Sequence, residues 1–97
     1  MAVTVVLQLN MKPEARDEVV GSFKSVLPDT RAYDGCLGLR VFEDQDDRNH
    51  IVLIEQWESK EHYEKYVAWR TETGFMDQMG EALTSEPSFL YLDGIGA

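Results

Sequence analysis

Aromatic side chains gather in one stretch of this 97-residue chain, between residues 57 and 75. The group consists of Trp57, Tyr63, Tyr66, Trp69 and Phe75, and it is followed directly by Met76 and Met79. Side chains of this bulk can line an apolar pocket in which a few polar groups fix the orientation of a ligand. We expect the two tyrosine hydroxyls and Arg70 to supply those polar contacts. For each aromatic residue taken singly, packing in the core is the alternative.

Two ionisable residues near this stretch are candidates for chemistry. His62 could act as a base near neutral pH, or it could have a partly exposed structural role. Glu55 lies in an otherwise apolar segment, where a carboxylate needs a partner. We predict a structural ion pair between Glu55 and Arg40, and a role for Glu55 in a ligand cavity is the alternative.

Other kinds of site have no support in the sequence. Cys36 is the single cysteine, so an internal disulfide is excluded, and no Cys/His cluster has the spacing of zinc ligands. Nucleotide-binding glycine loops and nucleophile elbows are absent. We therefore predict no metal site.

The elements that must position these residues follow from hydrophobic periodicity. We predict strands at 3–9, 36–43, 50–57 and 89–92, a helix at 15–30, a helix after Ser59 that Gly74 interrupts, and a short helix from Phe75 to Leu83. Apart from the short helix, the order is β-α-β-β-α-β, as in the ferredoxin-like fold. The prediction is an α+β protein, a single domain over residues 1–97, with two helices on one face of a four-stranded antiparallel sheet.

The other face of this sheet also carries apolar residues. The predicted strand at 50–57 has Val52 and Ile54 on one side and Leu53 and Trp57 on the other. A large apolar patch in water is a liability, and a second copy could cover it. We predict a two-fold homodimer; an open face that is merely amphipathic is the alternative.

The charge balance limits the partners. Nine basic and 18 acidic residues give a net charge of −9. Because nucleic acids and anionic membranes attract the opposite balance, neither is an expected partner. The apolar runs are too short to span a bilayer, and residues 1–4 do not resemble a signal peptide. We therefore expect a cytoplasmic protein.

Several segments carry a resemblance to a known family: Gly35-Cys36-Leu37, Glu55-Gln56-Trp57-Glu58-Ser59, the stretch from Tyr63 to Arg70, and Pro87. Over nearly its whole length the chain resembles the antibiotic biosynthesis monooxygenase family. The resemblance implies a dimeric α+β barrel with the ferredoxin-like topology. The family is functionally mixed, so the reaction does not follow from the resemblance alone.

One branch of that family implies a reaction. It oxidises phenols or hydroquinones with O₂ and uses no metal, flavin or haem. Its substrate-holding Trp and Tyr match Trp57 and Tyr63, whereas its Asn is replaced by Leu53. We expect Tyr66 and Arg70 to bind a phenolate, with His62 as a reserve base. The residues expected to line the rest of the substrate site are Trp69, Phe75, Met79, Leu53 and Phe42.

A second branch of the family degrades haem. That branch uses a His before the last strand and an Asn on the first strand. Residues 74–83 contain no His, and Val6 matches the Asn position. Haem degradation is therefore not expected. The first hypothesis is a cofactor-independent oxidoreductase acting on a small planar aromatic molecule. The second is a non-catalytic, dimeric ligand-binding module on the same scaffold.

Overall fold

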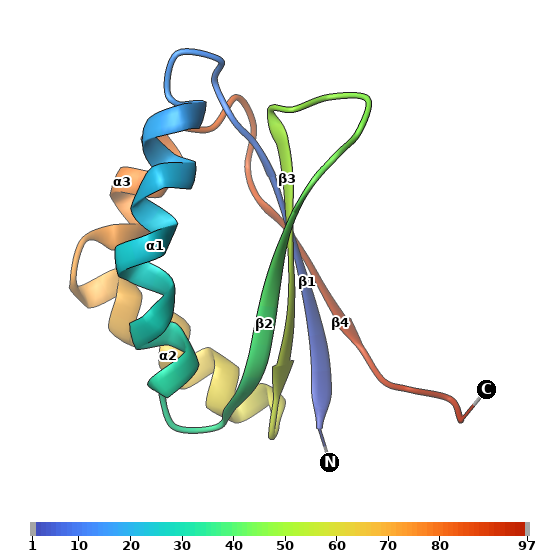
Figure 1. The fold of residues 1–97 in the computed structure, drawn as a ribbon. Coiled ribbons are helices and arrows are strands. Elements are labelled where there is room, and N and C mark those ends of the chain that lie inside the picture. The colour runs from blue at the N-terminus through green and yellow to red at the C-terminus, as the bar shows by residue number, and fades with distance from the viewer. Residues whose placement is uncertain (1, 97) are drawn as a thin grey trace.

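The computed structural model describes residues 2–96, which form one antiparallel sheet and three helices (Figure 1). The elements are β1 (Val3–Asn10), α1 (Arg16–Ala32), β2 (Cys36–Glu43), β3 (His50–Trp57), α2 (Lys60–Glu72), α3 (Phe75–Glu81) and β4 (Ser88–Leu92). The strand order is β2-β3-β1-β4, and all neighbours are antiparallel. This confirms the predicted ferredoxin-like α+β fold, including the short additional helix.

Figure 1 shows all three helices of the described residues on one side of the sheet and no helix on the other. The side chains of the strands alternate between the two faces of the sheet accordingly. On β3, Ile51, Leu53, Glu55 and Trp57 are buried, whereas Ile54 is exposed. The face of the sheet that carries the buried residues is therefore the one that the helices cover. We call the opposite face the open face.

The helices present matching stripes to the covered face. On α1 the buried residues are Phe23, Leu27 and Thr30, at the i, i+4 and i+7 spacing of one helix face. Pro28 lies inside α1 on its exposed side, and the helix continues two residues beyond the predicted end, to Ala32. Pro28 cannot donate the i→i−4 hydrogen bond of the helix, and its place on the exposed side keeps this loss away from the packed stripe. On α2 the buried residues are Tyr63, Tyr66 and Arg70.

The open face carries apolar side chains on several strands. Ile54, Val6 and Leu90 are direct neighbours across β3, β1 and β4. Ile54 is 37% exposed and Leu90 is 44% exposed. Within residues 2–96, no helix combines the length and the apolar character needed to cross a membrane.

Candidate active site

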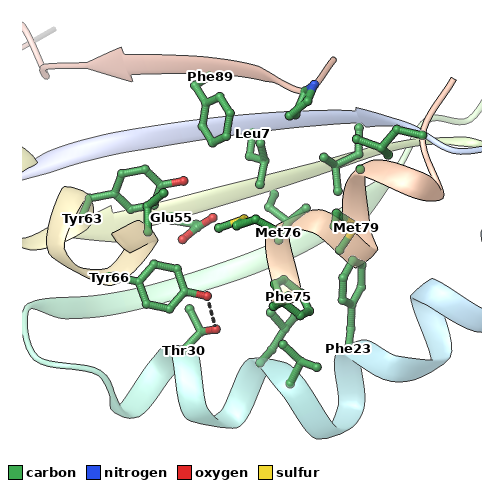
Figure 2. Close-up of a pocket in the computed structure, with 18 residues that line it drawn as sticks. Leu7, Phe23, Thr30, Glu55, Tyr63, Tyr66, Phe75, Met76, Met79 and Phe89 are labelled. Carbon is green, nitrogen blue, oxygen red and sulfur yellow. Dashed lines mark hydrogen bonds between the residues drawn. The ribbon is translucent and has the colours of Figure 1, made fainter. Parts of the chain in front are cut away.

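A pocket of about 270 Å³ lies between the covered face of the sheet and the helices. Its wall includes Leu53 on β3 and Phe89 on β4, and α3 contributes Phe75, Met76 and Met79. Four of the 18 lining residues carry side-chain oxygen atoms: Thr30, Glu55, Tyr63 and Tyr66. Figure 2 shows these four at one end of the pocket, with the aromatic and methionine side chains of Phe75, Met79 and Phe23 toward the other. The pocket therefore has a polar end and an apolar end.

Glu55 supplies the carboxylate of the polar end. The residue is only 3% exposed, and its Oε1 accepts a hydrogen bond of 3.1 Å from Nε1 of Trp57. Trp57 lies two residues further along β3 and therefore on the same side of the strand. Burial raises the pKa of Glu55, and the Trp57 hydrogen bond opposes that rise. No Lys, Arg or His of residues 2–96 forms an ion pair with Glu55.

The second oxygen of Glu55 faces the pocket. Every fully buried side-chain oxygen and nitrogen of the described residues has a hydrogen-bond partner. Oε2 has no hydrogen-bond partner among residues 2–96, so this atom is not fully buried. Because Glu55 lines the pocket, the space beside Oε2 is the pocket. A ligand in the pocket can therefore reach a free carboxylate oxygen.

Tyr66, Thr30 and Arg70 form a hydrogen-bonded network at the same end. Arg70 donates through Nε to the Tyr66 hydroxyl and through Nη2 to the Thr30 hydroxyl, at 3.0 Å each. The two hydroxyls are 2.7 Å apart, and either can donate to the other. One of the two hydroxyl hydrogens forms the hydrogen bond between them, so the other hydroxyl hydrogen is free to be donated. Because both residues line the pocket, this O–H is available to an oxygen atom of a ligand.

Arg70 is a buried cation without an anion. Its side chain is 6% exposed, and among residues 2–96 no carboxylate forms an ion pair with it. Its guanidinium lies 4.5 Å from the ring centroid of Trp69 and 5.0 Å from that of Phe75. Its third contact is the carbonyl of Val26, at 3.0 Å. A buried charge normally has a counter-charge, and through the Tyr66 and Thr30 hydroxyls Arg70 can support an anionic ligand oxygen beside them.

The Tyr63 hydroxyl is the third polar group of the pocket. The side chain is 1% exposed, and its ring packs edge-on against Trp57 at 5.5 Å. Its hydroxyl has no partner among the described residues and points into the pocket in Figure 2. Burial raises the pKa of Tyr63, and the nearby Glu55 carboxylate raises it further. Tyr63 therefore stays protonated and can donate a hydrogen bond to a ligand.

Comparisons with known proteins agree with this fold. The family model for antibiotic biosynthesis monooxygenase matches residues 2–75. The chain belongs to this family. A comparison with curated proteins finds none that matches.

Solved structures extend the likeness of this family member over nearly the whole chain. One, described as an antibiotic biosynthesis monooxygenase, is 26% identical, covers 96% of this chain and 98% of its own, and has a TM-score of 0.86. A protein from Mycobacterium tuberculosis is 24% identical over 100% and 98% of the two chains, with a TM-score of 0.87. A conserved protein from Methanosarcina mazei Go1 is 20% identical over 95% and 91%, with a TM-score of 0.85.

The segment of the resemblance that runs from Glu55 to Ser59 has a clear structural role in this family member. Glu55 faces the pocket, and Trp57 holds one of its oxygens. The Ser59 hydroxyl then accepts the backbone N–H of His62 and caps α2. Because α2 begins there, Tyr63 and Tyr66 follow at the spacing that brings both to the covered face. The segment thus places the carboxylate and both tyrosines.

Eight of the predicted site residues lie in the pocket wall or directly behind it. Tyr63, Tyr66, Leu53, Phe75 and Met79 all line the pocket. Three others lie behind its wall: Trp57 contacts Glu55, Arg70 contacts Tyr66, and the Trp69 ring stacks on Tyr33 at 5.2 Å.

Two residues of β2 do not have the predicted roles. Arg40 was expected to pair with Glu55, but it lies opposite Ile54 on the open face, with its guanidinium 4.9 Å from the Phe42 ring centroid. Phe42 was expected in the substrate site and also lies on the open face, opposite Val52. The reason is a register shift between Cys36 and Gly38. Such a one-residue irregularity moves every later side chain of the strand to the other face.

His62 was expected as a reserve base, but the structure places it outside the pocket. Its Nδ1 is 2.6 Å from the Ser59 hydroxyl, and its Nε2 is 3.4 Å from a carboxylate oxygen of Glu58. Ligand atoms of Asp34, Glu58 and His62 lie within 4.8 Å of one another, but both acids are exposed. The hydrogen bond to Ser59 and the contact with Glu58 account for the position of His62 at the start of α2.

Some pocket residues were not predicted as site residues. Thr30 lies within the predicted helix at 15–30, and the available signal is a hydroxyl-bearing residue on the same helix face as Phe23 and Leu27. Phe23, Leu7 and Phe89 come from three elements that are distant from the aromatic stretch in the sequence. Only the packing of α1, β1 and β4 brings them to the pocket.

Proposed function

We propose that this protein is a monooxygenase that oxidises a two-ring phenol or quinol with O₂ and requires no metal, flavin or haem. The observation that carries the proposal is the arrangement of the pocket, in which the polar end holds one free carboxylate oxygen and two free hydroxyl hydrogens. Membership of the antibiotic biosynthesis monooxygenase family supports the reaction class.

The size of the pocket supports the choice of a two-ring substrate. A cavity of roughly 150 Å³ holds one benzene molecule, and this pocket measures about 270 Å³. Phe75, Met79 and Phe89 can enclose the rings at the apolar end. The ring hydroxyl would then lie at the polar end, among Glu55, Tyr63 and Tyr66.

The polar groups suit the chemistry of a phenolate. Hydrogen bonds from Tyr63 and from the Tyr66–Thr30 pair favour the charged form of the substrate oxygen, and Arg70 strengthens the second of these. A phenolate is electron-rich enough to reduce O₂ itself. One oxygen atom of O₂ enters the ring, and the other leaves as water with two hydrogens from the substrate. The products are a quinone and water, and no further reductant is consumed.

We also propose that the protein acts as a homodimer in the cytoplasm. Two copies that pack through their open faces would cover Ile54, Leu90 and Leu92, which are otherwise 37–44% exposed. The covered face and its pocket would stay accessible from the helical side. The resulting assembly is the dimeric α+β barrel that the resemblance implies.

Oxygen uptake tests the reaction. The metal-free protein would be mixed with 1-naphthol or 1,4-naphthohydroquinone, and the variants Tyr66→Phe and Tyr63→Phe would be compared with Tyr33→Phe as the control. Among residues 2–96, the hydrogen-bond partner of the Tyr33 hydroxyl is the Lys65 carbonyl, outside the pocket. We expect uptake above the spontaneous rate, about 100-fold lower in Tyr66→Phe because an anion-stabilising donor is lost, and unchanged in Tyr33→Phe.

A non-catalytic module is the second candidate, and Leu53 favours it. This residue lies in the pocket wall where the quinone-forming branch of the family carries an asparagine. Tight anaerobic binding of naphthols without any oxygen uptake would support this candidate and refute the monooxygenase.

A further inference from the structure

We propose that the Glu55 carboxylate is the base of this pocket and takes the proton from the ring hydroxyl of the bound ligand through its free oxygen, Oε2. The O–H bond of the ligand breaks, an O–H bond forms on Glu55, and the electron pair stays on the ligand oxygen. The use of this step in oxidation rests on the proposed function. The proton transfer itself does not.

Position is the first argument. Oε1 is held by Trp57 Nε1, so the carboxylate has a fixed direction, and Oε2 is left to the pocket. The free hydroxyl hydrogens of Tyr63 and of the Tyr66–Thr30 pair are at the same end. A ring hydroxyl at this end can donate to Oε2 while its oxygen accepts from a tyrosine or threonine.

The other groups that face Glu55 are poor bases. Burial raises the pKa of the Tyr63 and Tyr66 phenols on α2 and of the Cys36 thiol on β2, so all three are protonated at neutral pH. On β1, the residue opposite Glu55 is Val5, which carries no ionisable group. Among the described residues that line the pocket, Glu55 is the one group that can accept a proton at neutral pH.

The environment also reduces the difference between the pKa of Glu55 and the pKa of a bound phenol. An ordinary glutamate and an ordinary phenol differ by roughly six pKa units. Burial raises the pKa of Glu55. The hydroxyl donors and Arg70 lower the pKa of a bound phenol. The two effects act in opposite directions on the two partners, so both favour the transfer.

The charges of the pocket are balanced after the transfer. Before it, the buried anion is Glu55 and the buried cation is Arg70, and no ion pair joins the two. After it, Glu55 is neutral, and the anionic ligand oxygen lies next to the network that Arg70 supports. The transfer moves the negative charge to hydrogen-bond donors and leaves the net charge unchanged. This explains why a carboxylate without a cation partner occupies an apolar wall.

Proton uptake on anaerobic binding tests the proposal independently of oxidation. The probe is 2,4-dinitro-1-naphthol, which is fully ionised in water over the pH range used and resists oxidation. If an ionised Glu55 must become neutral beside the bound anion, each bound probe takes up one proton. Calorimetry in buffers of different ionisation enthalpy measures this number from pH 6 to pH 9.

We expect uptake in the wild type to rise toward one proton per bound probe as the pH increases and Glu55 ionises in the free protein. In Glu55→Gln, which keeps an acceptor for Trp57, we expect no uptake. The exposed carboxylate of Glu72 provides the control, because Glu72→Gln should behave as the wild type does. Circular dichroism of each variant establishes that it is folded.

Oxygen uptake then separates this proposal from the proposed function. If Glu55 is the base, Glu55→Gln lowers the oxidation rate of 1-naphthol about 100-fold or more, and it changes the rate of a pre-ionised substrate less than tenfold. Equal proton uptake in the wild type and Glu55→Gln would overturn the role of Glu55 even if both oxidise naphthol. Loss of proton uptake in Glu55→Gln, with no oxidation by any form, would support the role of Glu55 and refute the monooxygenase. Failure of the wild type to bind the probe would overturn both.

Discussion

Replacement of Arg70 by methionine should raise the pKa of a bound naphthol by about two units while leaving the fold nearly as stable. The charge acts through Tyr66, whose hydroxyl lies 3.0 Å from Arg70 Nε. A further hydrogen bond of about 2.8 Å places a ligand oxygen ~6 Å from the cation. At an effective dielectric constant of about 20, the attraction is ~2.8 kcal/mol. One pKa unit corresponds to about 1.36 kcal/mol, so the loss amounts to two units.

The expected effect of Arg70→Met on stability is small because two large contributions oppose each other. The three hydrogen bonds of Arg70 contribute about 1.5–3 kcal/mol each. Burial of a charge costs several kcal/mol, and methionine removes that cost. The hydroxyls of Tyr66 and Thr30 still bond each other. We therefore expect the free energy of unfolding to change by less than about 2 kcal/mol.

An absorbance titration of 1-naphthol bound without oxygen measures its pKa in each protein. Arg31→Met is the matched control, since Arg31 is exposed on α1 and donates a hydrogen bond of 3.5 Å to the Leu39 carbonyl, away from the pocket. Arg70→Lys should fall between the wild type and Arg70→Met, because lysine keeps the charge and loses the fork of donors. An unchanged pKa in a folded Arg70→Met would refute the assignment of Arg70 to the anion site.

Three further predictions follow from single contacts. Because the pKa of Glu55 is raised in the folded state, its carboxyl group contributes stability below the pKa of the unfolded chain, about 4.3, and this contribution is lost as the pH rises through the folded value. Glu55→Gln should therefore melt at a higher temperature than the wild type at pH 7. Melting temperatures that are equal for the two proteins at both pH 7 and pH 4 would contradict this. Gly35 has φ +90°, and a Cβ there would lie 2.5 Å from the His62 ring. Gly35→Ala should therefore lower the free energy of unfolding by roughly 2 kcal/mol. A loss of less than about 0.5 kcal/mol in urea titrations would argue against that contact. Ile54→Glu on the open face should convert the proposed dimer to a monomer in light scattering, whereas Ala68→Glu on the exposed side of α2 should leave the dimer intact. If both variants remain dimeric, this interface is excluded.

Local periodicity was sufficient to predict the elements. Strands β2 and β3 have the predicted bounds, and β1 and β4 differ by one residue each. The alternation of β3 also predicted which of its residues share a face, because side chains on a strand alternate with a period of two. The capped start of α2 was predicted from Ser59, whose hydroxyl accepts the backbone N–H of His62.

The register of β2 could not be predicted. Counted from Cys36 with a period of two, Arg40 and Phe42 would share the face of Trp57, which Cys36 lies opposite. The shift between Cys36 and Gly38 reverses this, and Gly38 adopts φ +148°, a conformation that residues other than glycine rarely adopt. Gly38 is a local signal that permits a bulge, but strand pairing decides whether the shift occurs there.

The sequence by itself determined the order of the elements, the apolar stripes of the helices and the aromatic character of the site, since each depends on spacing along one segment. Only the tertiary structure decided the chemistry of the pocket. It turned Glu55 toward Tyr63 and Tyr66, separated it from Arg40, and joined Arg70 to Thr30 across two helices. Those relations depend on register and helix packing, in which residues 40 positions apart meet, and on burial, which gives an ordinary carboxylate a raised pKa.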